Sequence, residues 1–94
     1  MTSLRRYLER MCDRLEAVLG ASSVPGRVTH GTVGAGAAVL VLVPAPYRRF
    51  EEYYALRETI AAALWVTSVL MWREDGCVVI RCDLNITGAV IASD

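Results

Sequence analysis

The spacing of hydrophobic residues changes along this chain, and each spacing predicts a different element. Near the start, apolar residues recur at steps of four and three, the spacing of one helix face. They are Leu4, Leu8, Met11, Leu15 and Val18. This stripe predicts a helix over residues 3–19, with Ser3 as its N-cap and Gly20 directly after its end. The stripe would also suit a coiled-coil seam, but its short length favours ordinary core packing.

An uninterrupted apolar run at residues 37–43 is the strongest strand signal in the chain. It reads Ala-Ala-Val-Leu-Val-Leu-Val, without the alternation of a half-exposed strand. Such a run is typical of a strand that is covered on both faces. A weaker strand is predicted at residues 27–33, and Gly34-Ala35-Gly36 predicts a flexible turn between the two strands. Pro44 and Pro46 end the apolar run.

A second amphipathic helix is predicted at residues 47–64, followed by a β-hairpin. The apolar residues that share one face of this helix are Phe50, Tyr53, Leu56, Ile60, Ala63 and Leu64. Strands are predicted at 66–73 and 77–84, because Glu74-Asp75-Gly76 between them is typical of a tight turn. The apolar tail predicts a further edge strand at residues 86–92.

The order α-β-β-α-β-β predicts a single α+β domain spanning residues 1–94, with a βαββ-like module at 27–85 and a tail at 86–94. Its sheet is expected to be antiparallel or mixed, with the helices packed on one face. The chain has 94 residues, of which 54% are hydrophobic, so a folded core or an apolar surface covered in an oligomer would both suit it. Its formal net charge is zero, which gives no general signature of nucleic-acid or membrane binding.

Motifs for catalysis, metal binding or cofactor binding are absent from the sequence. It has no phosphate-binding loop, its single histidine, His30, has no nearby acids or thiols, and its three cysteines form no CxxC pair. We therefore expect no enzyme, no cofactor and no metal. The cysteines are expected to be reduced thiols of a cytoplasmic protein. No apolar stretch is long enough for a membrane span or a signal peptide.

Two local features stand out against this background. Arg48 and Arg49 fall in the first turn of the second predicted helix, where the helix dipole disfavours cations. Either Glu51 and Glu52 offset these charges, which we favour, or the arginines meet an anion such as a phosphate. The second feature is a pair of tryptophans, Trp65 and Trp72, which flank one strand on opposite faces. One is expected in the core and the other at a rim or interface.

Residues 34–85 resemble the small non-motor domain, called the α domain, that precedes the ATPase core in the FtsK/SpoIIIE family of DNA translocases. Gly34-Ala35 stands where that family has Gly-Pro, Ala45-Pro46 matches its Ala-Pro, and Arg49 takes the place of a lysine. Further matches are Leu56, Ile60-Ala61, Leu64 and Leu84-Asn85. The register extends to about residue 24. The family's strand arginine is Val39 here, its glycine after Ala-Pro is Tyr47, the lysine of its hairpin turn is absent, and the motor is missing.

The resemblance implies a stand-alone, non-catalytic accessory module that associates with itself and with double-stranded DNA, or with a separate motor protein. The residues expected to contact DNA phosphates are Arg48, Arg49, Arg27 and Arg73. Those expected at an interface between copies are Leu8, Leu15 and Trp72. The alternative is a protein-interaction or oligomerisation domain without a nucleic-acid role, which the neutral net charge favours. A small enzyme is the least favoured interpretation, because acid–base candidates lack partners.

Overall fold

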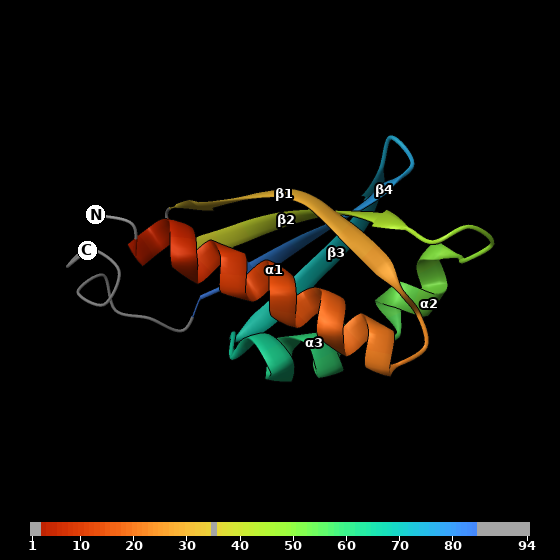
Figure 1. Cartoon of the computed structure of the whole chain (residues 1–94), viewed down its shortest axis with the longest axis horizontal. Helices are drawn as coiled ribbons and strands as arrows, with labels where there is room; N and C mark the ends of the chain where they lie inside the picture. Colours follow the sequence, from red (N-terminus) through yellow and green to blue (C-terminus); the bar gives the residue numbers. More distant parts are fainter. Residues whose placement is uncertain (1–2, 35, 85–94) are drawn as a thin grey trace.

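Seven helices and strands follow one another in the computed structural model, which describes residues 3–34 and 36–84 (Figure 1). They are α1 (Ser3–Ala21), β1 (Gly26–Gly34), β2 (Ala37–Pro44), α2 (Phe50–Tyr54), α3 (Arg57–Leu64), β3 (Ser68–Glu74) and β4 (Cys77–Asp83). The predicted α+β class is confirmed, and each predicted strand that falls on described residues is present. The strand predicted at 86–92 lies outside the described residues.

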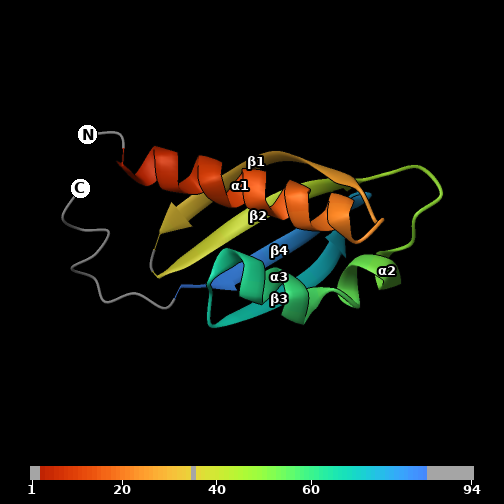
Figure 2. The ribbon, with the colours of Figure 1, turned by 60° about the horizontal axis from the view of Figure 1, so that its bottom comes forward.

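The four described strands form one antiparallel sheet in the order β1-β2-β4-β3. The prediction of an antiparallel or mixed sheet therefore resolves to an antiparallel one. All three described helices lie on the same face, with α1 and α3 side by side across the sheet and α2 near one end (Figure 2). The prediction of helices on one face is confirmed.

The hydrophobic core fills the space between this face and the helices. Alternate residues of the two central strands point into it: Ala38, Leu40 and Leu42 from β2, and Val78, Ile80 and Cys82 from β4. The helices contribute Met11, Leu15, Leu19, Ile60 and Leu64. Complete burial of each larger apolar side chain contributes about 1.5–3 kcal/mol, so these residues supply most of the driving force for folding.

The opposite face of the sheet has no described helix or strand over it, and we call it the open face. Its exposed or half-buried residues are Thr32, Val39, Val41, Val43, Leu70, Trp72 and Arg81, with Val79 at its centre. Along β2 the alternating valines are half-buried rather than buried. The expectation that β2 is covered on both faces is therefore not met by the described part of the chain.

β1, at one edge of the sheet, pairs irregularly with β2. The register shifts between Val28 and His30, so that one extra residue lies on the β1 side. At this point the Val28 N–H donates to Glu16 Oε2 of α1 at 2.7 Å, and the Thr29 hydroxyl donates to the Val41 carbonyl at 3.3 Å. The irregularity is thus held by a carboxylate from the helix layer and by a side-chain hydroxyl.

α1 continues past Gly20, which was predicted to follow its end. The residue in the left-handed conformation that terminates the helix is Ser23, with a φ of 62°. The Val24 N–H donates to Leu19 O at 3.0 Å and the Ser23 N–H to Gly20 O at 3.1 Å, the pair of bonds found at many helix ends. A serine fills the position that glycine usually takes, so the position of Gly20 gave the wrong boundary.

The single helix predicted at 47–64 is two helices, and this prediction was wrong in two places. The chain first turns through Tyr47, whose φ is 67°, and Arg49 is extended, so the first helical residue is Phe50. A second break follows at Ala55 and Leu56, where the Leu56 N–H bonds to Tyr53 O three residues back. Tyr53 before the break and Ile60 after it are both completely buried, in the same core cluster.

Gly31 of β1 lies where a larger residue would collide with the core. A β-carbon at this position would lie 2.6 Å from Leu40 Cδ2 and 3.2 Å from the Val39 carbonyl oxygen. We expect Gly31→Ala to lower the free energy of unfolding by about 1–3 kcal/mol, measured by urea denaturation. The matched control is Gly34→Ala in the same strand, where an added β-carbon would meet no atom within 4 Å beyond the adjoining residues. Equal stability of the two variants would contradict the packing described for Gly31.

Candidate nucleic-acid interface

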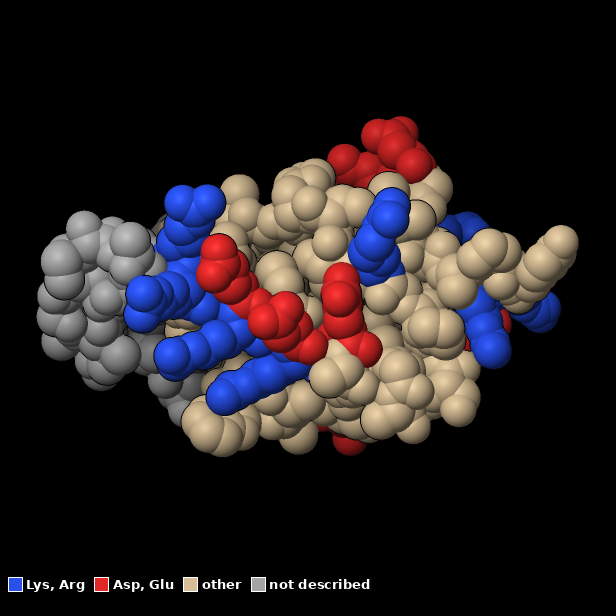
Figure 3. Space-filling view, viewed as in Figure 1, with Lys and Arg blue, Asp and Glu red and all other residues tan. Residues whose placement is uncertain are grey.

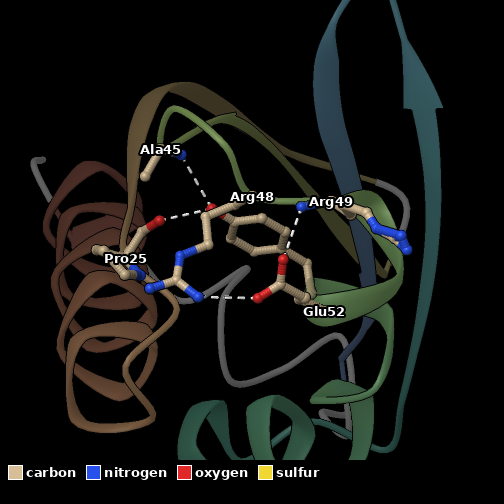
Figure 4. Close-up of polar contacts among 6 residues, drawn as sticks. Pro25, Ala45, Arg48, Arg49 and Glu52 are labelled. Atoms are coloured by element: carbon tan, nitrogen blue, oxygen red, sulfur yellow. Dashed lines mark hydrogen bonds and ion pairs between the residues drawn. The ribbon is translucent and has the colours of Figure 1, made fainter.

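The loop between β2 and α2 is held in place by the buried side chain of Tyr53. Its hydroxyl accepts the Ala45 N–H at 3.0 Å and donates to the Pro25 carbonyl at 2.5 Å (Figure 4). The Tyr53 ring is completely buried. This one side chain therefore joins the start of β1, the end of β2 and α2, and it fixes the loop that carries Arg48 and Arg49.

Glu52 forms an ion pair with one of these two arginines, Arg48. Its Oε1 accepts a hydrogen bond from Arg48 Nη1 at 2.9 Å, and its Oε2 accepts the Arg49 N–H at 2.8 Å (Figure 4). These two bonds, the Arg49 N–H first, lower the pKa of the Glu52 carboxyl. The favoured interpretation, that an acid of the helix offsets the arginine charge, is confirmed for Arg48 by its ion pair with Glu52.

A surface pocket of about 340 Å³ brings three of the predicted arginines together. Arg48 and Arg49 reach it from the β2–α2 loop, and Arg73 reaches it from the end of β3. The rest of its lining is Pro44, Phe50, Glu51, Gly76, Cys77 and Val78. Within residues 3–34 and 36–84, Arg49 and Arg73 form no ion pair. Two arginines that form no described ion pair thus line the pocket, and Glu51 is the acid in its wall.

From this pocket a row of four side chains follows α2, with two aromatic rings of that helix between an arginine of β3 and an arginine of α3. The Arg73 guanidinium carbon lies 5.8 Å from the Phe50 ring centre, the Phe50 and Tyr54 ring centres are 5.6 Å apart, and the Arg57 guanidinium carbon lies 3.9 Å from the Tyr54 ring centre. We call these four residues the arginine–aromatic strip. Arg57 and Tyr54 were not predicted as site residues, although their spacing of three within the single helix predicted at 47–64 is a usable signal. In the structure they lie on either side of the break between α2 and α3.

Arg27, the fourth predicted arginine, does not join this site. It lies opposite Val43 near the same end of the sheet, but on the open face, whereas Arg73 lies opposite Val78 on the helix-covered face. The two arginines are therefore on opposite sides of the sheet. The structure separates Arg27 from the other three.

The three predicted interface residues have different environments. Leu15 is completely buried in the core, which favours the core interpretation of its stripe over a place between copies. Leu8 is half-buried and packs against the same core. Trp72 is exposed on the open face, where its Nε1 donates to Glu74 Oε1 at 3.0 Å. Trp72 alone is available for an interface of the kind predicted.

Trp65 is also exposed, which contradicts the expectation that one tryptophan is in the core. It ends α3 with a φ of 57°, and the residue is 77% exposed. The Arg14 guanidinium carbon of α1 lies 4.7 Å from its ring centre. A third pairing of arginine with an aromatic ring therefore lies between α1 and α3.

The outer surface of α1 carries both charge signs. Arg6, Arg10 and Arg14 recur at steps of four along one side, and Glu9 and Asp13 lie beside them. In Figure 3 the blue side chains gather near one end of the helix and the red ones border them directly. Arg5 pairs with Glu9 at 3.7 Å. Because the acids interrupt the basic side chains, this surface provides no continuous positive field.

No group of three His, Cys, Asp or Glu side chains within the described ranges is arranged to hold a metal ion. Burial, with the Asp83 charge, raises the pKa of the Cys82 thiol to about 12. Cys82 is consequently a neutral thiol near pH 7, without the thiolate character of a nucleophile. None of the described helices has the length and apolar composition needed to cross a membrane.

Comparison with known proteins gives no functional assignment, so the proposal below is based on the fold and the pocket. No protein-family model matches this sequence, and no curated protein is significantly similar to it. The resemblance to the translocase α domain accordingly stays a prediction.

Proposed function

We propose that this chain is a non-catalytic accessory module that binds the phosphate backbone of DNA and associates with itself. The observation that carries the proposal is the convergence of Arg49 and Arg73 on one pocket. These residues come from segments far apart in the sequence, and neither is ion-paired in the described part of the chain. A guanidinium group presents a planar fork of donors that fits phosphate oxygens, so the pair is suited to one phosphate or two successive ones.

The arginine–aromatic strip supports the same proposal. Arginines that contact phosphates and rings that stack on bases or sugars recur together in nucleic-acid-binding surfaces. The strip continues directly from the pocket, so the two form one surface along α2 and the end of β3. The predicted correspondence of Arg49 to a lysine of the translocase α domain agrees with this placement.

We expect Arg49→Ala and Arg73→Ala each to weaken binding to a short DNA duplex by about five- to tenfold at low salt. Removing one phosphate contact should also reduce the slope of log affinity against log salt by about 0.9. Fluorescence anisotropy with labelled duplexes of unrelated sequence measures both quantities. Because phosphate contacts carry no sequence information, every duplex should lose affinity equally.

Two further variants separate this site from general charge. Arg5→Ala removes an equal charge from the α1 surface and is expected to leave affinity unchanged beyond a small screened effect. Glu51→Gln removes the acid in the pocket wall and is expected to strengthen binding. Unchanged affinity in both Arg49→Ala and Arg73→Ala would overturn the proposal.

The second candidate is a protein-interaction domain with no nucleic-acid role. It is favoured by the apolar residues on the open face, among which Leu70 is 54% and Trp72 39% exposed. Light scattering behind size exclusion, with and without duplex DNA, distinguishes the two candidates. An oligomer that ignores DNA would support this second candidate.

A further inference from the structure

β3 forms one edge of the sheet, and its exposed side chains are of the kind found on strands that pair with a strand of another molecule. It is hydrogen-bonded to β4 alone among the described strands. Its other side therefore pairs with no strand in the described part of the chain, and the N–H and C=O groups there favour the addition of another strand. Leu70 and Trp72 project from this strand as large exposed apolar side chains.

Protective features that usually prevent such pairing are missing from most of β3. Between Ser68 and Trp72 the strand has no proline, no charge and no irregular pairing. A pocket of about 200 Å³ runs beside it, lined by Tyr54, Arg57 and residues 69–72. β1 at the opposite edge differs, because its register is shifted and its exposed residues there are Thr29, His30 and Thr32.

We infer that β3 pairs with the β3 of a second copy of this chain, in antiparallel orientation about a two-fold axis at Met71. The two four-stranded sheets then become one continuous sheet. With Met71 opposite itself, all residues of the strand Ser68–Glu74 find a partner. The inference rests on the self-association part of the proposed function and requires no DNA.

The strand is complementary to itself in this register. Leu70 lies opposite Trp72 of the other copy, twice, which extends the apolar cluster of the open face across the axis. On the helix-covered side Val69 lies opposite Arg73 of the other copy, and at the ends Ser68 lies opposite Glu74. No two like charges of β3 are directly opposed.

The size of such an interface sets the concentration at which it forms. Pairing of one short strand falls at the low end of specific interfaces, below about 1,200 Å² of total buried surface. We therefore expect a reversible dimer with a dissociation constant roughly in the micromolar range. Sedimentation velocity across that range, without DNA, is the suitable measurement.

Leu70→Lys is the variant that tests the pairing. It places a charge on the exposed side of the edge strand, where lysine opposes strand addition. The matched control is Thr32→Lys. Thr32, Val39, Arg81 and Leu70 lie in one cross-strand row of the open face, so the two lysines occupy equivalent places on opposite edges. Leu70→Lys is expected to raise the dissociation constant of the dimer at least about tenfold, and Thr32→Lys to leave it unchanged.

Hydrogen exchange then distinguishes edge pairing from packing between two open faces. In the dimer, the outward amides of β3 should exchange more slowly as concentration rises, whereas those of β1 should not change. Circular dichroism verifies that both variants are folded. The inference is overturned by a monomer throughout the micromolar range, by an unaltered dimer in Leu70→Lys, or by a dimer in which β3 gains no protection. None of these results bears on the change in DNA affinity expected for Arg49→Ala. The pairing of β3 and the binding of DNA can therefore be disproved independently.

Discussion

Leu15→Ala is expected to lower the free energy of unfolding by about 2–5 kcal/mol, the range for truncating a buried leucine. Leu15 of α1 is completely buried, in a cluster that includes Leu19, Leu40 and Ile60. The substitution removes apolar surface from the core and leaves a cavity that rigid sheet residues cannot fill. A domain of this size has a total stability of roughly 5–10 kcal/mol, so the variant should be partly unfolded near body temperature.

Urea denaturation followed by circular dichroism measures this loss. Leu70→Ala is the matched control, because it truncates the same side chain at a position that is 54% exposed. At concentrations that keep the protein monomeric, Leu70→Ala is expected to change stability by less than about 0.5 kcal/mol. If Leu15→Ala were instead as stable as Leu70→Ala and altered the oligomeric state, Leu15 would belong to an interface after all.

The second large effect is expected for Tyr53→Phe, which we predict to destabilise the domain by about 2–4 kcal/mol. The variant keeps the buried ring and removes only the hydroxyl, which bonds to both Pro25 and Ala45. The Pro25 carbonyl and the Ala45 N–H then lose their shared partner at two partly buried hydrogen bonds, and a polar group left unsatisfied away from water costs about 1–3 kcal/mol. Thermal unfolding gives the change in midpoint, and urea denaturation gives the free energy.

Tyr54→Phe provides the comparison at the neighbouring residue. Tyr54 is exposed, and its hydroxyl forms no hydrogen bond within the described residues. We expect its removal to leave stability unchanged within about 0.5 kcal/mol. Because the Tyr53 hydroxyl fixes the β2–α2 loop, Tyr53→Phe should also weaken DNA binding through Arg49 while Tyr54→Phe leaves it unchanged. Equal stability of the two variants would show that the loop is held by other contacts.

The strands were predictable because short apolar runs bounded by glycine, proline or Asp-Gly leave few alternatives. The burial of β2 was not predictable, because its uninterrupted run of apolar residues also fits a strand that is buried on both faces. In the structure β2 lies between β1 and β4, and these neighbours shield the flanks of Val39 and Val41. Half-burial within a sheet is therefore enough to accommodate valines, and the run does not imply a second covering layer.

The broken second helix shows a different limit. Phe50, Tyr53, Leu56, Ile60 and Leu64 fit one continuous helix face, and no glycine or proline within residues 47–64 marks a break. The geometry depends on two distant partners of the Tyr53 hydroxyl, Pro25 and Ala45. Tertiary contacts of this kind decide local structure without leaving a periodic signal.

The candidate site was predictable in part. Arg48 and Arg49 stand out because they are adjacent at a predicted helix start, whereas Arg73 was named only with the resemblance to the translocase domain. That Arg73 meets Arg49 in one pocket, and that Arg27 does not, follows from which face of the sheet each residue takes. Such placement depends on strand register, which a one-residue shift inverts and which the sequence does not specify for β1.

The shifted pairing between Val28 and His30 has a consequence for how far assembly proceeds. A fibre grows only if each added molecule offers a fresh edge to the next, as in stacked cross-β structures. A bulge twists its strand away from a regular ladder, so β1 is a poor template for a further sheet. Growth through β3 would therefore stop at a closed pair. A chain that is 54% hydrophobic would in this way pair through the edge strand β3 and still not polymerise into fibres.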